Sequence, residues 1–171
     1  MDNTVGISLG NVCKSAIYGV ENKLRLKKNE GYKTCPFDLC VSNVEGIIKC
    51  FNDDFKDFCN HTLLHYDDNS KQIIHQKYKF SFNHECPYHA DLYIKEKWPE
   101  GAFHFVNNNY KNFRDRYNMR IQNFRYYCKS NYNIIFILQF TDDKYSDELM
   151  SKLNKAIKTR YPNLKYTIKI I

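Results

Sequence analysis

The chain has 171 residues, which is enough to bury one hydrophobic core without disulfide or metal staples. Lysine and arginine number 26 against 19 acidic residues, and the net charge of +7 is dispersed along the chain, so composition gives only weak support for a nucleic-acid partner. No uncharged apolar run approaches the ~20 residues of a membrane span, which excludes a transmembrane protein. We therefore expect a single domain over residues 1–171 and no membrane partner.

The cysteine content bears on the compartment. There are seven cysteines, an odd number, and no charged-then-apolar leader precedes the first predicted strand. We therefore expect reduced thiols and a cytoplasmic location. The abundance of Lys, Asn, Ile and Tyr is typical of AT-rich genomes, including those of large DNA viruses. A viral origin would make the location the host cytoplasm.

The N-terminal segment predicts a strand that feeds a cysteine onto a helix. Apolar residues alternate from Val5 to Leu9, Gly10 and Asn11 permit a tight turn, and helical periodicity begins at Cys13. A thiol at a helix N-terminus lies among unpaired N–H groups, which stabilise a thiolate and can bind an oxyanion. Cys13 is therefore a candidate nucleophile.

The alternative for Cys13 is an inert core residue. The apolar positions that follow it at helical spacing are Ala16, Ile17, Val20 and Leu24. Cys13 is in phase with this stripe, and cysteine is among the most buried residue types. The segment alone leaves both interpretations open.

The middle of the chain predicts a loop, a helix and a strand. Residues 35–39 form a loop, and Ser42 with Glu45 makes a capping box that starts a helix. The apolar face expected for this helix consists of Val44, Ile47, Ile48, Phe51, Phe55 and Phe58. Residues 60–71 are polar and predict a loop, and residues 78–82 alternate as a strand that places His84 just past its end.

The C-terminal half predicts a long helix over 110–129, followed by a β-α-β unit. Arg120 lies at the margin of the helix's apolar stripe, where a guanidinium needs a carboxylate or an anionic ligand. Residues 134–138 form a continuous apolar run typical of a central strand, and residues 164–170 alternate as a half-exposed one. The alternation of strands and helices predicts an α/β fold, layered as α/β/α, with a partly parallel sheet.

Three short motifs resemble a family of uncharacterised proteins described as papain-like cysteine peptidases. They are Ser8-Leu9-Gly10-Asn11-Val12-Cys13, the Pro36-Phe37-Asp38 element and the pair His84-Glu85. Leu39 replaces the tryptophan that follows the second motif in the family. The resemblance implies a papain-like α+β fold as the alternative, with the cysteine helix packed against an antiparallel barrel.

The resemblance implies a hydrolase that cleaves an amide, ester or thioester in a protein or peptide substrate. Cys13 would be the nucleophile and His84 the base, because an imidazole titrates near neutrality. Asp38 would orient His84, although Asp142 is an alternative because Cys13, His84 and Asp142 each follow a predicted strand and could converge. Asn11 and nearby N–H groups would hold the oxyanion, and Arg120 would position an anionic substrate group.

We expect no metal and no cofactor. The segment from His84 to His89 resembles a zincin motif, but its histidines are five residues apart with Pro87 between them, which removes the helical geometry. The alternative to an enzyme is a non-catalytic factor, viral or host-interacting, that binds protein or nucleic acid and holds Cys13 in its core.

Overall fold

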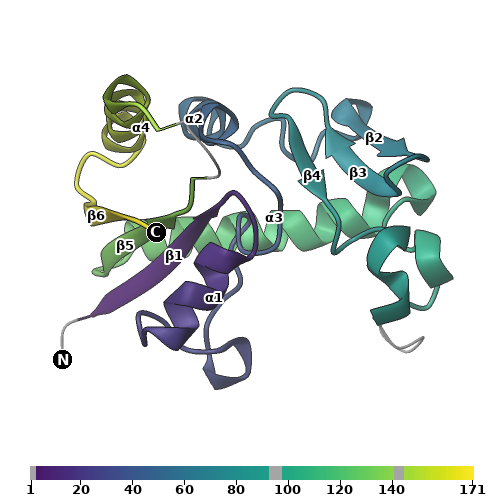
Figure 1. The fold of residues 1–171 in the computed structure, drawn as a ribbon, viewed down its shortest axis with the longest axis horizontal. Helices are drawn as coiled ribbons and strands as arrows, with labels where there is room; N and C mark the ends of the chain where they lie inside the picture. The colour runs from purple at the N-terminus through teal and green to yellow at the C-terminus, as the bar shows by residue number, and fades with distance from the viewer. Residues whose placement is uncertain (1–2, 93–97, 141–144) are drawn as a thin grey trace.

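The computed structural model describes residues 3–92, 98–140 and 145–171. Two three-stranded sheets lie at opposite ends of the molecule, and one long helix, α3, runs past both of them (Figure 1). The strands are β1 Thr4–Gly10, β2 Leu64–Asp67, β3 Gln72–His75, β4 Phe80–Phe82, β5 Asn133–Leu138 and β6 Lys165–Ile170. The α-helices are α1 Lys14–Glu21, α2 Val44–Asp53, α3 Asn107–Lys129 and α4 Asp147–Arg160.

The first sheet is parallel, with strand order β1-β5-β6. Residues Asn133 to Leu138 lie between the other two strands, paired with β1 on one side and with β6 on the other. The apolar run therefore forms the central strand, as its sequence predicts. The C-terminal β-α-β unit is confirmed by α4 between β5 and β6.

Helices cover both faces of the parallel sheet. On one face α1 approaches closely, because Gly19 has no side chain and a Cβ there would lie 3.0 Å from Ile137 Cδ1. On the other face Phe136 of β5 packs against Phe51 of α2 and Phe124 of α3, at ring-centroid distances of 6.2 Å and 6.1 Å. The predicted α/β layered fold is confirmed, and the strand that feeds Cys13 belongs to the parallel sheet.

The second sheet is antiparallel, with strand order β2-β3-β4. Its first strand lies within residues 60–71, so the loop predicted there is wrong: Tyr66 pairs with Ile73 across the hairpin. His84 follows β4, which belongs to this sheet, so Cys13 and His84 do not follow strands of one sheet as expected. Asp142 lies outside the described residues.

Two helix details differ from the sequence prediction. The N-cap of α2 is Asn43, whose Oδ1 accepts a hydrogen bond from Gly46 N at 2.7 Å, while Ser42 bonds to the Cys13 turn instead. Helix α1 buries Ser15, Ala16 and Gly19, whereas Ile17 is exposed. Small residues allow α1 to lie close to the sheet, and this shifts its buried face away from the larger apolar side chains.

Helix α3 extends past both sheets and buries the stripe that its sequence predicts, which comprises Phe113, Tyr117, Ile121, Phe124 and Cys128. Arg120 is buried beside this stripe. Among the described residues, no helix combines the length and the apolar character that a membrane span requires.

Candidate active site

The cysteine turn is a sharp connection from β1 to α1. Gly10 and Asn11 both have positive φ, at 91° and 74°, and Cys13 occupies the N-cap position of α1. The first N–H groups of an α-helix lack intrahelical acceptors, so the thiol lies beside backbone donors. A Cβ on Gly10 would clash with Ser42 Oγ, so this position requires glycine for space as well as for conformation.

Three buried serines fix the turn. Ser42 Oγ accepts a hydrogen bond from Asn11 N at 2.9 Å and donates one to Leu9 O at 3.0 Å. Ser8 Oγ accepts from Gly10 N at 3.0 Å and lies 2.6 Å from Ser15 Oγ. The backbone N–H of Asn11 is thus already used, so the N–H groups at the start of α1 are the backbone donors we assign to an oxyanion, and the role expected of Asn11 stays a prediction.

Sequence reasoning did not assign a role to these serines. The available signal is that Ser8 is the polar residue in an otherwise apolar strand and is fully buried. A buried hydroxyl needs partners, and those partners are the atoms of the turn that follows.

Among the seven cysteines, Cys13 is one of two that are not buried; the other is Cys59. Burial raises the pKa of the Cys59 thiol to about 12. Burial likewise raises the pKa of Cys35, Cys40, Cys50, Cys86 and Cys128. These six thiols stay protonated at neutral pH and cannot serve as thiolate nucleophiles.

His84 lies just past β4, as predicted, and is partly buried. Its ring stacks on that of His89 with centroids 4.8 Å apart. Burial lowers the pKa of His84 below its usual value of 6.5, and the charges of His89 and Arg120 lower it further against the opposing effect of Glu85. The imidazole is therefore neutral at physiological pH, which is the form that accepts a proton.

The acidic partner of His84 in the sequence motif is fully buried. Glu85 accepts ion pairs from Arg120 at 2.9 Å and from Arg116 at 3.3 Å, and a hydrogen bond from Tyr117 OH at 3.2 Å. The prediction that Arg120 pairs with a carboxylate is confirmed. The guanidinium is 7% exposed and neutralises Glu85, and its role in positioning a substrate stays a prediction.

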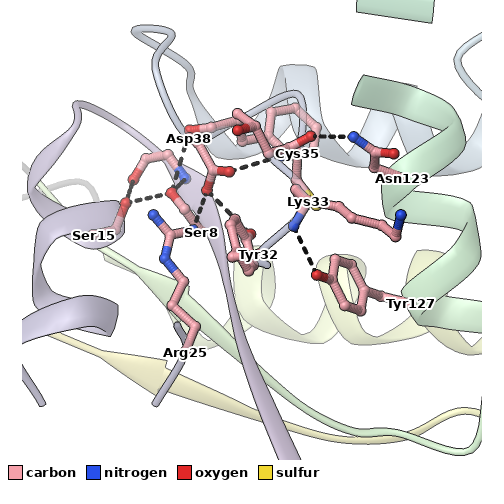
Figure 2. A network of polar contacts seen from close by, with 12 residues as sticks. Ser8, Ser15, Arg25, Tyr32, Lys33, Cys35, Asp38, Asn123 and Tyr127 are labelled. Carbon is pink, nitrogen blue, oxygen red and sulfur yellow. Dashed lines mark hydrogen bonds and ion pairs between the residues drawn. The ribbon is translucent and has the colours of Figure 1, made fainter. Parts of the chain in front are cut away.

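Asp38 forms a different network from the one predicted (Figure 2). Its Oδ1 pairs with Arg25 Nη1 at 2.5 Å, and its Oδ2 accepts a hydrogen bond from Cys35 N at 2.7 Å. Arg25 in turn stacks over the ring of Tyr32. The carboxylate is 2% exposed and holds the loop after α1, so the structure gives it an anchoring contact with Arg25 rather than with His84.

The predicted site residues come from elements of both sheets. Asn11 and Cys13 share the turn after β1 of the parallel sheet, and His84 follows β4 of the antiparallel sheet. The loop before α2 links these two places, because Val41 pairs with Ser81 of β4 and Ser42 bonds to Asn11. In the described part of the chain, the ring of His89 stacks on that of His84, and Cys13 occupies the N-cap of α1. The described residues contain no group of three or more His, Cys, Asp or Glu side chains placed to hold a metal ion.

Comparison with known proteins gives one match. The model of a family described as "putative papain-like cysteine peptidase" matches residues 4–171, which covers both sheets, the cysteine turn and His84. No curated protein and no solved structure matches the chain.

Proposed function

We propose that the chain is a thiol-dependent hydrolase of amide, ester or thioester bonds in a peptide or protein, with Cys13 as its nucleophile, because it belongs to the family described as "putative papain-like cysteine peptidase". One observation carries the assignment. Cys13 is the partly exposed thiol at a helix N-terminus, while burial keeps the other six protonated. Reactive cysteines occupy such N-terminal positions, and structural ones are buried and inert.

In the proposed reaction, Cys13 Sγ attacks the carbonyl carbon while the thiol proton passes to His84. The developing oxyanion is held by N–H groups at the start of α1. The imidazolium then protonates the leaving nitrogen or oxygen as the bond to carbon breaks. Water, deprotonated by His84, hydrolyses the thioester and restores the thiol. Catalytic hydrogen bonds commonly tighten only in the substrate complex, so we expect the Cys13 sulfur and the His84 imidazole to make their contact there.

The test of this proposal is the site of alkylation by iodoacetamide at pH 6, mapped by mass spectrometry in the native protein. We expect Cys13 to be modified well before the six buried or half-buried thiols, because a helix N-terminus favours the reactive form of a thiol and burial disfavours it. Cys59 is the internal control, since it is also partly exposed but has a raised pKa. An unreactive Cys13 would contradict the proposal and favour a non-catalytic binding protein.

His84 makes a second prediction, in the pH dependence of the reaction. An imidazole acts as a base only when it is neutral, and burial lowers the pKa of His84. When the rate of labelling by a peptide-type electrophile is measured against pH, we therefore expect it to fall on the acidic side only below pH 6.5. His84→Asn should remove this fall and slow labelling about 10²-fold or more. The control is His65→Asn, which alters an exposed histidine of β2. It should change neither the labelling rate nor its pH dependence. An unaltered profile in His84→Asn would exclude this residue as the base.

A further inference from the structure

A cavity of about 660 Å³ lies at the carboxyl ends of β1 and β5, between the N-terminal ends of α2 and α4. Ligands of open α/β sheets bind at this edge. Asn11 lines the cavity, and Cys13 follows it by two residues, so at most about 7 Å of chain separates their Cα atoms. The cavity therefore opens beside the proposed nucleophile.

The wall of this cavity has six apolar residues among polar and charged ones, and its charge is balanced. Its apolar lining consists of Val41, Val44, Ile47, Leu138, Phe140 and Leu149. Its charged lining residues are two acids, Glu45 and Glu148, and two lysines, Lys79 and Lys152. Glu148 and Lys152 pair with each other at 2.6 Å. Such a wall favours an apolar side chain over a charged one.

Gln139 places a buried acceptor next to the cysteine turn. This residue follows β5 and lines the cavity together with Asn11, and it also lines a smaller hollow together with Lys14. Asn11 and Lys14 bracket Cys13 in the sequence, so Gln139 lies near the cysteine turn. Its Oε1 is buried and has no hydrogen-bond partner among the described residues. A buried acceptor without a partner is costly and is expected to bond to a ligand.

We infer that this cavity binds an apolar side chain of a peptide substrate and that Gln139 Oε1 accepts a hydrogen bond from a substrate backbone N–H, which orients the adjacent carbonyl toward Cys13. Gln139 is thus a positioning residue. The inference rests on the proposed function, because it assigns a substrate class to the Cys13 site. An anionic or cationic side chain would lose hydration against the six apolar residues of the wall and would meet no net opposite charge there.

The side-chain preference is tested with peptide-type electrophiles that differ only in the residue next to the reactive group. We expect leucine and phenylalanine probes to label Cys13 about 10- to 100-fold faster than aspartate or lysine probes. Leu149→Gln, in the cavity wall, should reduce this ratio several-fold. Met119→Gln, an exposed apolar residue of α3, is the matched control and should leave the ratio unchanged. Equal rates for all probes would overturn the inference.

The role of Gln139 is tested by Gln139→Met, which keeps the size of the side chain but removes the acceptor. We expect it to slow the leucine probe about tenfold and to have no effect on the same probe with its amide N-methylated. If the labelling rate falls with both probes, or with neither, the positioning role of Gln139 is wrong. Iodoacetamide labelling of Cys13 distinguishes failure of this inference from failure of the proposed function. If Cys13 is labelled but the peptide probes show no side-chain preference, only this inference is wrong. If Cys13 is not labelled, the proposed function itself is wrong.

Discussion

Cys13→Ser and Cys13→Ala should both abolish labelling by peptide-type electrophiles while the protein keeps its fold. Serine replaces the sulfur with an unactivated hydroxyl, and loss of a catalytic nucleophile typically costs on the order of 10³-fold or more in turnover. Cys13 is partly exposed at the N-cap of α1, so neither substitution leaves a sealed cavity. We expect melting temperatures within about 3 °C of the parent, measured by circular dichroism.

Cys59→Ser is the matched control for this experiment, because it alters a thiol of similar exposure far from the turn. It should leave labelling unchanged. The opposite pattern in the Cys13 variants, with strong destabilisation by serine and retained labelling, would identify Cys13 as a packing residue and place the reactive thiol elsewhere. In that case the burial of an unpartnered hydroxyl would cost about 1–3 kcal/mol, and alanine would cost less.

Glu85→Gln should be among the most destabilising single substitutions in the chain. Glu85 is fully buried and neutralises Arg120, which is 7% exposed. Removing one partner of a buried ion pair leaves an uncompensated charge and typically costs about 3–5 kcal/mol. For a domain of this size, we expect a fall in melting temperature on the order of 10 °C, measured by calorimetry.

The control for Glu85 is Glu148→Gln, which breaks an exposed pair with Lys152 and should leave the melting temperature unchanged. The double variant Glu85→Gln/Arg120→Met removes both charges together and should regain much of the lost stability, because an apolar replacement of a buried pair is often neutral. An unchanged melting temperature in Glu85→Gln would mean that Arg120 finds another partner or water.

Periodicity in the sequence predicted the elements that form the parallel sheet and the long helix. The continuous apolar run at 134–138 is typical of a strand covered on both faces. The apolar stripe of α3 indicates which side of that helix is buried. The position of Arg120 beside that stripe was sufficient to predict a carboxylate partner. The turn at Gly10 and Asn11 was equally clear, because both residues tolerate positive φ.

The contacts between distant segments could not be read from the sequence. Ser42 and Glu45 form a capping pattern, but Ser42 bonds to the Asn11 turn, 31 residues away, and the neighbouring Asn43 caps α2. Asp38 follows the family motif, yet its partner is Arg25, from a loop with no motif. His84 ends a strand, but nothing in the local pattern says to which sheet that strand belongs. Gln139 gave no signal, since its significance comes from an unmet hydrogen bond.

The division of the molecule into two sheets, with Cys13 in one half and His84 in the other, ties the proposed activity to the integrity of the whole chain. Helix α3 connects the halves, because it packs Phe124 on the parallel sheet and Tyr117 on Phe82 of the antiparallel one. A proteolytic cut or a local opening of this helix would loosen the packing between the two sheets, and with it the placement of His84 relative to Cys13, without touching either residue. Turnover would then be a more sensitive measure of cooperative folding than the content of helix and strand. Neither half of the chain would be active when expressed without the other.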